Sequence, residues 1–412
     1  MTSMCRANAS PVVKEHRTLF LVQVKPYPLS GGVSLRNWQN INLLAQQGPV
    51  AIFSLYKGSA DSASLPLSAA WEHYDLSAPS RPIWEKLQRR LWRFRPVGHA
   101  RADWLYTQDA ANQLRQRIAS FNPTLIIVEE IWLYRYLPIL QQIGCPLILD
   151  NHNVEGDDNR YQEGDSITYR MLPKIKCIEK KFIQAVDQVW MCSQEDVRRL
   201  HQLYSIKDTT TYVIPNGVNP DYYKAVPSSH TLPNTTKTLI YLGRFSYQPN
   251  IEAASILLNQ IYPLLKKTVG NCQLLLVGCD PTKAMLKAAQ ADANIIVTGQ
   301  VDDVRPYLAK ATVMVVPLQK GSGTRLKLLE AFAAKCPVIS TTKGAEGLEV
   351  EDEKQLLLRD SPTTIVEAIQ QLWQEPLKAQ TLTENAYRYL LERYTWSAVG
   401  QKIQSCLAQL SK

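Results

Sequence analysis

Short apolar runs alternate with helical stretches along the first half of the chain. The strand-like runs fall at residues 18–24, 50–55, 125–128, 147–149 and 188–191. Between the first two, apolar residues recur at helical spacing and predict a helix over 34–47, with Ser34 as its N-cap. Apolar strands separated by helices predict a parallel sheet that is covered on both faces.

A second series of the same kind follows residue 218. Residues 219–238 are polar and rich in proline, which is the composition of a linker. Further strand-like runs, each followed by a helix candidate, fall at residues 239–242, 273–277, 295–297, 312–316 and 337–340. A chain of 412 residues is also long enough for two domains. We therefore expect two successive α/β halves that meet near residue 218.

The composition narrows the class of protein. Apolar residues make up 45% of the chain and charged residues 20%, which excludes a disordered protein. No apolar run reaches the roughly 18–20 residues needed to cross a bilayer, and the polar N-terminus does not fit a secretory signal peptide. The eight cysteines are scattered singly, as is typical of a reducing compartment. We expect a cytoplasmic protein.

The positive charge of the chain is concentrated in one segment. The net charge is +9, and residues 81–101 hold seven Lys or Arg side chains against one acid, Glu85. A helix over 81–95 would carry an apolar face of Trp84, Leu87, Leu91 and Phe94. Such a basic amphipathic helix predicts docking on an anionic membrane surface, and the alternative is an ordinary surface helix. The rest of the chain is nearly balanced, which argues against nucleic acid as a partner.

The clearest chemical signal lies in residues 313–347. A buried strand ends at Pro317 and is followed by a glycine-rich loop and then by a helix; the loop is formed by Gly321, Ser322, Gly323 and Thr324. Small residues let the backbone approach a phosphate, and the free N–H groups of a helix N-terminus attract anions. Arg325 and Lys327 add positive charge. Glu330 lies in a largely apolar helix and needs a partner if buried, such as a ribose diol; the alternative is a plain turn with a glutamate at the core edge.

The run GSGTRLKLLEAFAAKCPVISTTKGAEGL resembles the donor-site signature of glycosyltransferase family 4, whose members are retaining enzymes with the GT-B fold. Other matching stretches are PLSGG after the first strand, LILDNHNVE at 147–155, VIPNGVNPDYY at 213–223, YLGRFSYQPNIEA at 241–253 and VTGQVDDVRPYLAKATVMVVP at 297–317. The resemblance implies an α/β protein of two Rossmann-like domains whose parallel sheets face a deep interdomain cleft. We expect an acceptor-side domain over 1–218, a donor domain over 219–385, and a C-terminal helix over 386–412 that packs back on the first domain.

The resemblance also implies roles for individual residues. Glu330 matches a glutamate that binds the nucleotide ribose, Arg244 an arginine on the donor phosphates, and His152 a histidine beside the donor sugar. The alternatives are a core-edge glutamate, a surface arginine and a structural histidine. The expected catalytic residues are His152, Arg244 and Lys327. The expected donor-binding residues are Gly31, Gly32, Arg244, Gly321, Ser322, Gly323, Thr324, Arg325, Lys327 and Glu330.

Two departures from the family pattern concern the donor. Ser322 replaces a glutamate that would hold hydroxyls of the donor sugar, so the identity of the sugar stays open. In the family an arginine and a lysine bind the donor phosphates. Arg244 matches the arginine, but Pro249 and Asn250 occupy the place of the lysine. Lys327 is expected to supply the missing charge.

No metal ion is expected in the chemistry, because the family's fold needs none. Four side chains that lie close together in the sequence do not have the spacing of a standard ligand set; these are Asp150, His152, Asp157 and Asp158. Asp302 and Asp303 are expected to cap the helix that follows them.

These features predict transfer of a sugar, with retention of its anomeric configuration, from a UDP- or GDP-linked donor to an acceptor hydroxyl in polysaccharide or glycolipid synthesis. Preorganised cations and amides would stabilise the leaving diphosphate, without a cofactor. A GT-B-fold nucleotide-sugar epimerase and a non-catalytic polyanion- or membrane-binding protein are the alternatives. A nicotinamide dehydrogenase is excluded, because PLSGGVS lacks the G-x-G-x-x-G spacing. The sequence does not identify the sugar, the base, the linkage or the oligomeric state. It also leaves the acceptor open, and a lipid-linked molecule is one of the candidates.

Overall fold

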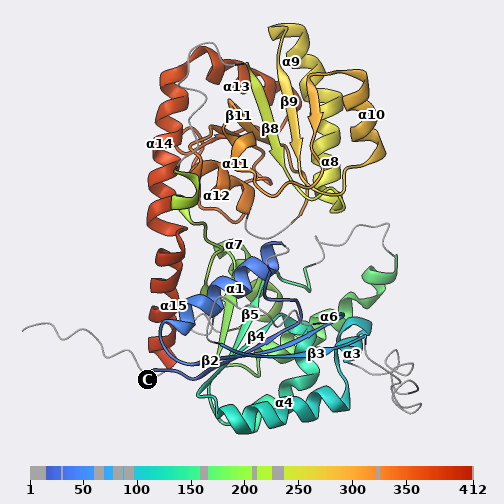
Figure 1. The fold of residues 1–412 in the computed structure, drawn as a ribbon, viewed down its shortest axis with the longest axis vertical. Coiled ribbons are helices and arrows are strands. Elements are labelled where there is room, and N and C mark those ends of the chain that lie inside the picture. Colours follow the sequence, from blue (N-terminus) through green and yellow to red (C-terminus); the bar gives the residue numbers. More distant parts are fainter. Residues whose placement is uncertain are drawn as a thin grey trace, which may run out of the picture.

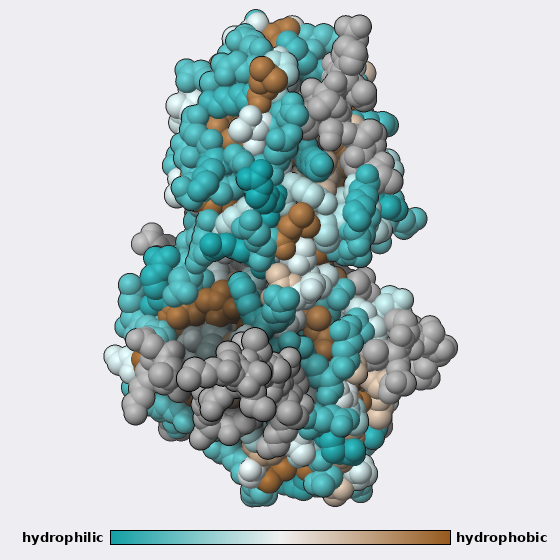
Figure 2. Space-filling model, turned by 90° about the vertical axis from the view of Figure 1, so that its left-hand side faces the viewer, coloured by the Kyte–Doolittle hydropathy of each residue, from teal (hydrophilic) through white to brown (hydrophobic). Residues whose placement is uncertain are grey.

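The computed structural model describes residues 15–28, 31–59, 69–77, 87, 97–157, 166–206, 211–224, 236–321 and 325–410. These residues form two α/β domains stacked along the long axis of the molecule (Figure 1). The space-filling view shows two lobes that narrow to a waist, with a mostly hydrophilic surface (Figure 2).

The N-terminal domain is built on a parallel sheet. Among the described residues it has seven strands in the order β3-β2-β1-β4-β5-β6-β7, and every neighbouring pair is parallel. The strands are β1 (Thr18–Val22), β2 (Val50–Tyr56), β3 (Ala70–Asp75), β4 (Leu125–Glu129), β5 (Leu147–Asn151), β6 (Gln188–Met191) and β7 (Thr211–Val213). Leu19 and Leu21 of β1 belong to one core cluster and Phe20 and Val22 to another, so the alternation of side chains along the strand buries both faces of the sheet.

Helices cover both faces of this sheet (Figure 1). They are α1 (Gly32–Ala45), α3 (Ala100–Leu105), α4 (Gln108–Phe121), the 3-10 helix η2 (Ile131–Tyr136), α5 (Leu137–Gln141), α6 (Ser166–Ile183) and α7 (Gln194–Tyr204). The predicted parallel sheet with two covered faces is confirmed.

The C-terminal domain repeats the architecture with a six-stranded sheet in the described residues, in the order β10-β9-β8-β11-β12-β13 and again entirely parallel. Its strands are β8 (Thr238–Leu242), β9 (Gln273–Val277), β10 (Ile295–Val297), β11 (Val313–Val316), β12 (Val338–Ser340) and β13 (Leu357–Leu358). Its helices are α8 (Gln248–Ile256), the π-helical turn η7 (Leu257–Ile261), α9 (Tyr262–Val269), α10 (Lys283–Ala291), α11 (Arg305–Leu308), α12 (Leu326–Ala333) and α13 (Pro362–Gln374).

The chain crosses between the domains twice, and the two crossings touch. The first leads to the 3-10 helix η5 (Pro220–Tyr223), and the second joins α14 (Pro376–Arg393) to α15 (Trp396–Leu410). The N–H of Val218 donates to the carbonyl of Tyr394 at 2.8 Å. A Cβ on Gly217 would lie 2.9 Å from the ring of Trp396, so only glycine fits between the crossings.

Helix α15 packs on the N-terminal domain, while α14 belongs to the C-terminal core (Figure 1). Val399 and Ile403 share a core cluster with Phe20 of β1, and the side-chain amide of Gln188 donates to the carbonyl of Cys406 at 2.7 Å. Position 386, the expected boundary, falls inside α14, and the chain leaves the donor domain only after Tyr394.

Candidate functional site

A cavity of about 560 Å³ lies between the two domains. One wall comes from the loop after β1 and the start of α1, and the other from the ends of β8 and β11 with helices α8 and α12. The carboxyl ends of parallel strands are where α/β folds bind their ligands. The lining residues are Gly31, Gly32, Leu35, Leu242, Gly243, Arg244, Tyr247, Asn250, Leu318, Arg325, Leu326, Lys327 and Glu330.

The two glycines of the N-terminal wall bring the domains close together. A Cβ on Gly32 would lie 3.3 Å from Cδ1 of Leu326 on the opposite wall. Gly31 caps α1, and its carbonyl accepts from the N–H of Leu35 at 2.9 Å and from the hydroxyl of Ser34 at 3.0 Å. The helix thus starts earlier than predicted and Ser34 lies in its first turn, because the glycine can already adopt the cap geometry.

Lys327 enters the cavity from α12 and contacts groups that come from β8 and α8. Its ammonium group donates to the hydroxyl of Tyr241 at 2.9 Å and to Oδ1 of Asn250 at 3.0 Å, and it lies 4.1 Å from the centroid of the Tyr241 ring. The amide of Asn250 in turn donates to the carbonyl of Arg244 at 2.8 Å. Burial, with the neighbouring Arg325 charge, lowers the pKa of Lys327 to about 7.

Two arginines flank this lysine. Arg244 is exposed at the end of β8, where its side chain lines the cavity. Arg325 is buried, and its guanidinium donates to the carbonyls of Gly321 at 3.0 Å and Lys343 at 3.3 Å. Arg325 therefore holds the glycine-rich loop in place as well as adding positive charge. Ser322, Gly323 and Thr324 lie outside the described residues.

Glu330 faces the same cavity and has a partner that the sequence reasoning missed. The hydroxyl of Tyr223, on the interdomain helix η5, donates to Oε1 of Glu330 at 3.3 Å. Burial raises the pKa of Glu330 to about 7, although Tyr223 and Lys327 both act to lower it. The motif VIPNGVNPDYY contained Tyr223, but only the fold brings it to α12.

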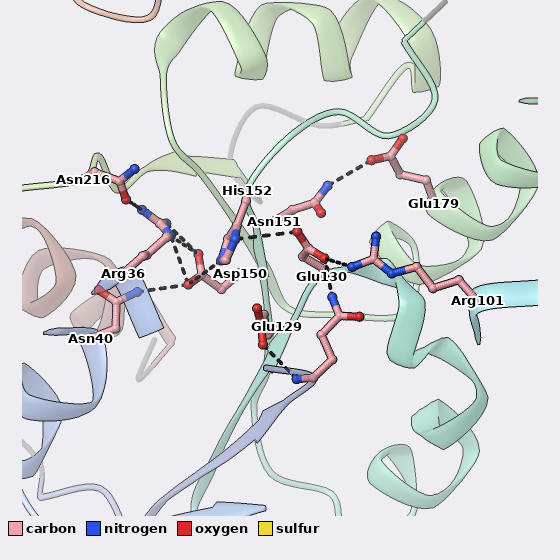
Figure 3. Close-up of polar contacts among 11 residues, drawn as sticks. Arg36, Asn40, Arg101, Glu129, Glu130, Asp150, Asn151, His152, Glu179 and Asn216 are labelled. Carbon is pink, nitrogen blue, oxygen red and sulfur yellow. Dashed lines mark hydrogen bonds and ion pairs between the residues drawn. The ribbon is translucent and has the colours of Figure 1, made fainter. Parts of the chain in front are cut away.

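A second polar cluster lies in the N-terminal domain, at the carboxyl ends of β4 and β5 (Figure 3). Arg36, on α1, makes a buried ion pair with Asp150, and its Nη2 lies 2.5 Å from Oδ1. The same guanidinium donates to the carbonyl of Ile214 at 2.6 Å, and Asn40 donates to Asp150 at 3.0 Å. Burial alone would lower the pKa of Arg36, but Asp150 raises it above the usual value.

His152 belongs to this cluster and is not among the residues that line the cavity. Its Nδ1 lies 3.6 Å from Oε1 of Glu130, and its Nε2 lies 3.9 Å from Oδ2 of Asp150. Burial lowers the pKa of His152 to about 4, although Asp150 opposes the shift, so the ring is neutral at pH 7. Burial and the adjacent Glu130 raise the pKa of Glu129 to about 8.

The loop that follows His152 is tied to the donor domain by an ion-pair chain. Arg199, on α7, lies 3.6 Å from Asp157 and hydrogen-bonds to Glu346 of the C-terminal domain. Glu346 also pairs with Lys343, whose carbonyl holds Arg325. The histidine loop and the glycine-rich loop are therefore connected across the interdomain gap.

Among the described residues, no group of three or more His, Cys, Asp or Glu side chains is placed to hold a metal ion. The N-cap of α11 is Val304 rather than Asp302 or Asp303, although Asp303, one position earlier, accepts from the N–H of Arg305 at 2.9 Å. In the same described part of the chain, no helix has the length and apolar character of a membrane span. The basic segment 81–95 lies outside the described residues, apart from Leu87, which is 58% exposed.

Comparison with known proteins gives relatives of similar sequence and solved structures of similar two-domain fold. The alignment with phosphatidyl-myo-inositol mannosyltransferase of Mycobacterium tuberculosis is 28% identical over 198 residues; it covers 46% of this chain and only 52%, about half, of that relative. Sucrose-phosphate synthase from Thermosynechococcus elongatus has a similar fold, with a TM-score of 0.73 at 19% identity, over 96% of this chain and 99% of that one. Anabaena Alr3699/HepE, solved in complex with UDP, gives a TM-score of 0.68 at 16% identity, over 95% and 99%.

Two family models match side by side and together span well over half of the sequence. The model of Glycosyltransferase Family 4 matches residues 72–222, and that of glycosyl transferases group 1 matches residues 236–375. With its two facing Rossmann-like domains and the cavity between them, the chain belongs to the group 1, family 4 glycosyltransferases of GT-B fold.

Proposed function

We propose that the chain transfers a hexosyl group from a UDP- or GDP-linked donor to an acceptor hydroxyl, with retention of the anomeric configuration. The observation that carries this proposal is the convergence of Arg244, Lys327 and Glu330 in one interdomain cavity, opposite Gly31 and Gly32. Two cations and a carboxylate at the carboxyl ends of parallel strands match a diphosphate joined to a ribose.

Arg244, Lys327 and the amides of the glycine-rich loop bind the donor diphosphate. Negative charge grows on the diphosphate as the glycosidic bond breaks, and preorganised donors in a partly buried site stabilise that charge more than water does. Glu330 accepts hydrogen bonds from the ribose hydroxyls. His152, in the polar cluster at the carboxyl ends of β4 and β5, contacts the donor sugar. No metal ion or other cofactor takes part.

The acceptor binds on the N-terminal side of the cleft. The match to a phosphatidyl-myo-inositol mannosyltransferase supports a lipid-linked or polyhydroxylated acceptor, and hence glycolipid or polysaccharide synthesis. The protein would work at the cytoplasmic face of a membrane, where residues 81–95 would hold it by their basic and aromatic side chains. Flotation with anionic liposomes at low and high salt, comparing wild type with R89E/R90E/R93E, tests this docking; equal recovery of both would contradict it.

The test of the function begins with binding. UDP, GDP and ADP are compared by thermal shift, because a ligand that binds only the native state raises its apparent stability. The matching nucleotide sugar is then incubated with candidate acceptors, and the anomeric configuration of the product is read by NMR. Release of the nucleotide with an altered free sugar, without any acceptor, would instead favour an epimerase. If no nucleotide binds, the remaining alternative is a non-catalytic protein. If EDTA abolishes sugar transfer and added Mg²⁺ restores it, the metal-free mechanism is wrong.

A further inference from the structure

Glu130 has a backbone conformation that residues other than glycine rarely adopt. Its φ is 56° and its ψ is 159°, in a region that is populated almost entirely by glycine. The residue follows β4 directly, and its N–H donates to the carbonyl of Asp150 at 3.0 Å, which continues the pairing of β4 with β5. Glycine would fit this backbone without strain. Since a glutamate is present instead, we infer that the contacts of its side chain offset the free-energy cost of the backbone strain.

The two carboxylate oxygens of Glu130 have different partners (Figure 3). Oε2 accepts from the amide of Gln23 and from Nη2 of Arg101, the latter at 3.2 Å. Oε1 faces Nδ1 of His152 at 3.6 Å. Glu130 is only 6% exposed, so its carboxylate is held by these neighbours rather than by solvent.

The imidazole of His152 is neutral and buried, so one ring nitrogen carries a hydrogen and the other accepts. The nearer carboxylate, that of Glu130, favours the hydrogen on Nδ1. Among the described residues Nε2 has no hydrogen-bond partner. Asp150, which lies 3.9 Å from Nε2, is already occupied by Arg36 and Asn40. A buried acceptor without a partner calls for a donor from a ligand.

We propose that Glu130 is a positioning residue that fixes His152 in its Nδ1–H tautomer, so that Nε2 accepts a hydrogen bond from a hydroxyl of the transferred sugar. This inference rests on the proposed function, since it takes His152 to contact the donor sugar. It also narrows the substrate class. A lone pair on Nε2, with the carboxylates of Glu130 and Asp150 nearby, suits a neutral sugar with a hydroxyl at this point and disfavours a sugar carboxylate.

The variant Glu130→Gln tests the proposal sharply. Two donors converge on Oε2, so the carbonyl oxygen of the new amide takes that position and its NH₂ group faces His152. The NH₂ group then requires Nδ1 to accept, and the hydrogen moves to Nε2. We expect ¹⁵N NMR of histidine-labelled protein to show this change of tautomer. We also expect kcat/KM for UDP-glucose or GDP-mannose, whichever the wild type uses, to fall about tenfold or more, while affinity for the free nucleoside diphosphate is unchanged. The exposed Glu392→Gln is the matched control.

Wild-type kinetics in Glu130→Gln, or an unaltered His152 tautomer, would overturn the proposal. If the wild type uses no nucleotide sugar, the proposed function fails, but the NMR measurement still decides whether Glu130 sets the tautomer. A second pair of variants tests the strain. Glu130→Gly and Glu130→Ala both lack the carboxylate and should lose the same activity, but the glycine variant should unfold at the higher temperature. Equal unfolding temperatures would contradict the view that function holds a glutamate in a glycine conformation.

Discussion

The ammonium group of Lys327 lies 3.0 Å from Oδ1 of Asn250, although the two residues are on different helices. Asn250 lies where the family pattern has a phosphate-binding lysine, and Lys327 reaches that position from α12. We therefore expect Lys327 to supply the missing positive charge from another element of the same wall. Asn250 keeps a structural role, because it links Lys327 to the carbonyl of Arg244.

Lys327→Met should weaken binding of the nucleoside diphosphate by about 10- to 100-fold, because a charge-assisted hydrogen bond contributes roughly 1.5–3 kcal/mol. Affinity for the corresponding nucleoside, which lacks phosphates, should not change. Isothermal titration of both ligands makes the comparison, and the exposed Lys287→Met on α10 is the control. Equal losses for nucleoside and diphosphate would mean that Lys327 only supports the wall of the cavity.

Tyr223→Phe removes the hydroxyl that donates to Glu330 and leaves the ring in place. We expect a loss of nucleotide affinity of about three- to tenfold, because the Glu330 carboxylate loses one hydrogen bond that orients it in the cavity. Glu330→Gln should cost more, because the charged acceptor for the ribose is lost. The same titrations with a 2′,3′-dideoxy nucleotide should be insensitive to both changes, and a full effect on that ligand would remove the ribose assignment.

The pKa values of Glu330 and Lys327, both near 7, predict a bell-shaped pH dependence of nucleotide-sugar binding. Below about pH 7, Glu330 takes up a proton and loses its charge; above about pH 7, Lys327 gives up its proton. Affinity should therefore fall on both sides. Glu330→Gln should abolish the acid limb and Lys327→Met the alkaline limb. Tyr223→Phe should move the acid limb to higher pH, because the tyrosine lowers the pKa of Glu330. A flat profile between pH 5.5 and 9 would contradict the assignment.

The apolar pattern predicts most of the fold, and the strands that it misses are either partly exposed or very short. Strands with both faces buried are continuous apolar runs, so β1, β6 and β9 are evident from the sequence. β3 reads AWEHYD and lies at a sheet edge with its side chains partly exposed, so hydrophobicity does not mark it. β7 and β13 are only three and two residues long, too short for any period.

Some residues of the candidate site could likewise be predicted from the sequence, and others could not. The donor wall could be predicted because Arg325, Lys327 and Glu330 are neighbours in the sequence and meet on one loop and helix. Tyr223 and Glu330 are 107 positions apart, and their contact depends on where the interdomain crossing packs. Glu130 lies two positions after the strand that the apolar pattern predicts over 125–128, and this position is a signal that the sequence offers. Its importance is visible only in its backbone angles and in the side chains around it.

The ion pair of Arg36 and Asp150 yields a prediction about stability. Both side chains are almost fully buried, and Arg36 also holds the carbonyl of Ile214, so the pair joins α1 to the ends of β5 and β7. Arg36→Met leaves the Asp150 carboxylate buried without its counter-ion, which should destabilise the protein by about 3–5 kcal/mol. Arg115→Met, at an exposed position of α4, should change stability by less than about 0.5 kcal/mol.

The companion variant Asp150→Asn separates the charge from the packing. In R36M/D150N no uncompensated charge remains, so the double variant should be more stable than the sum of the two single effects predicts. Urea unfolding of the four proteins gives the coupling energy directly. Two results would contradict this view: the effects of the two substitutions on the free energy of unfolding simply add, or Arg36→Met is as stable as the wild type. Either result would show that solvent or another cation reaches Asp150. In that case the network around His152 would be less rigid than these contacts imply.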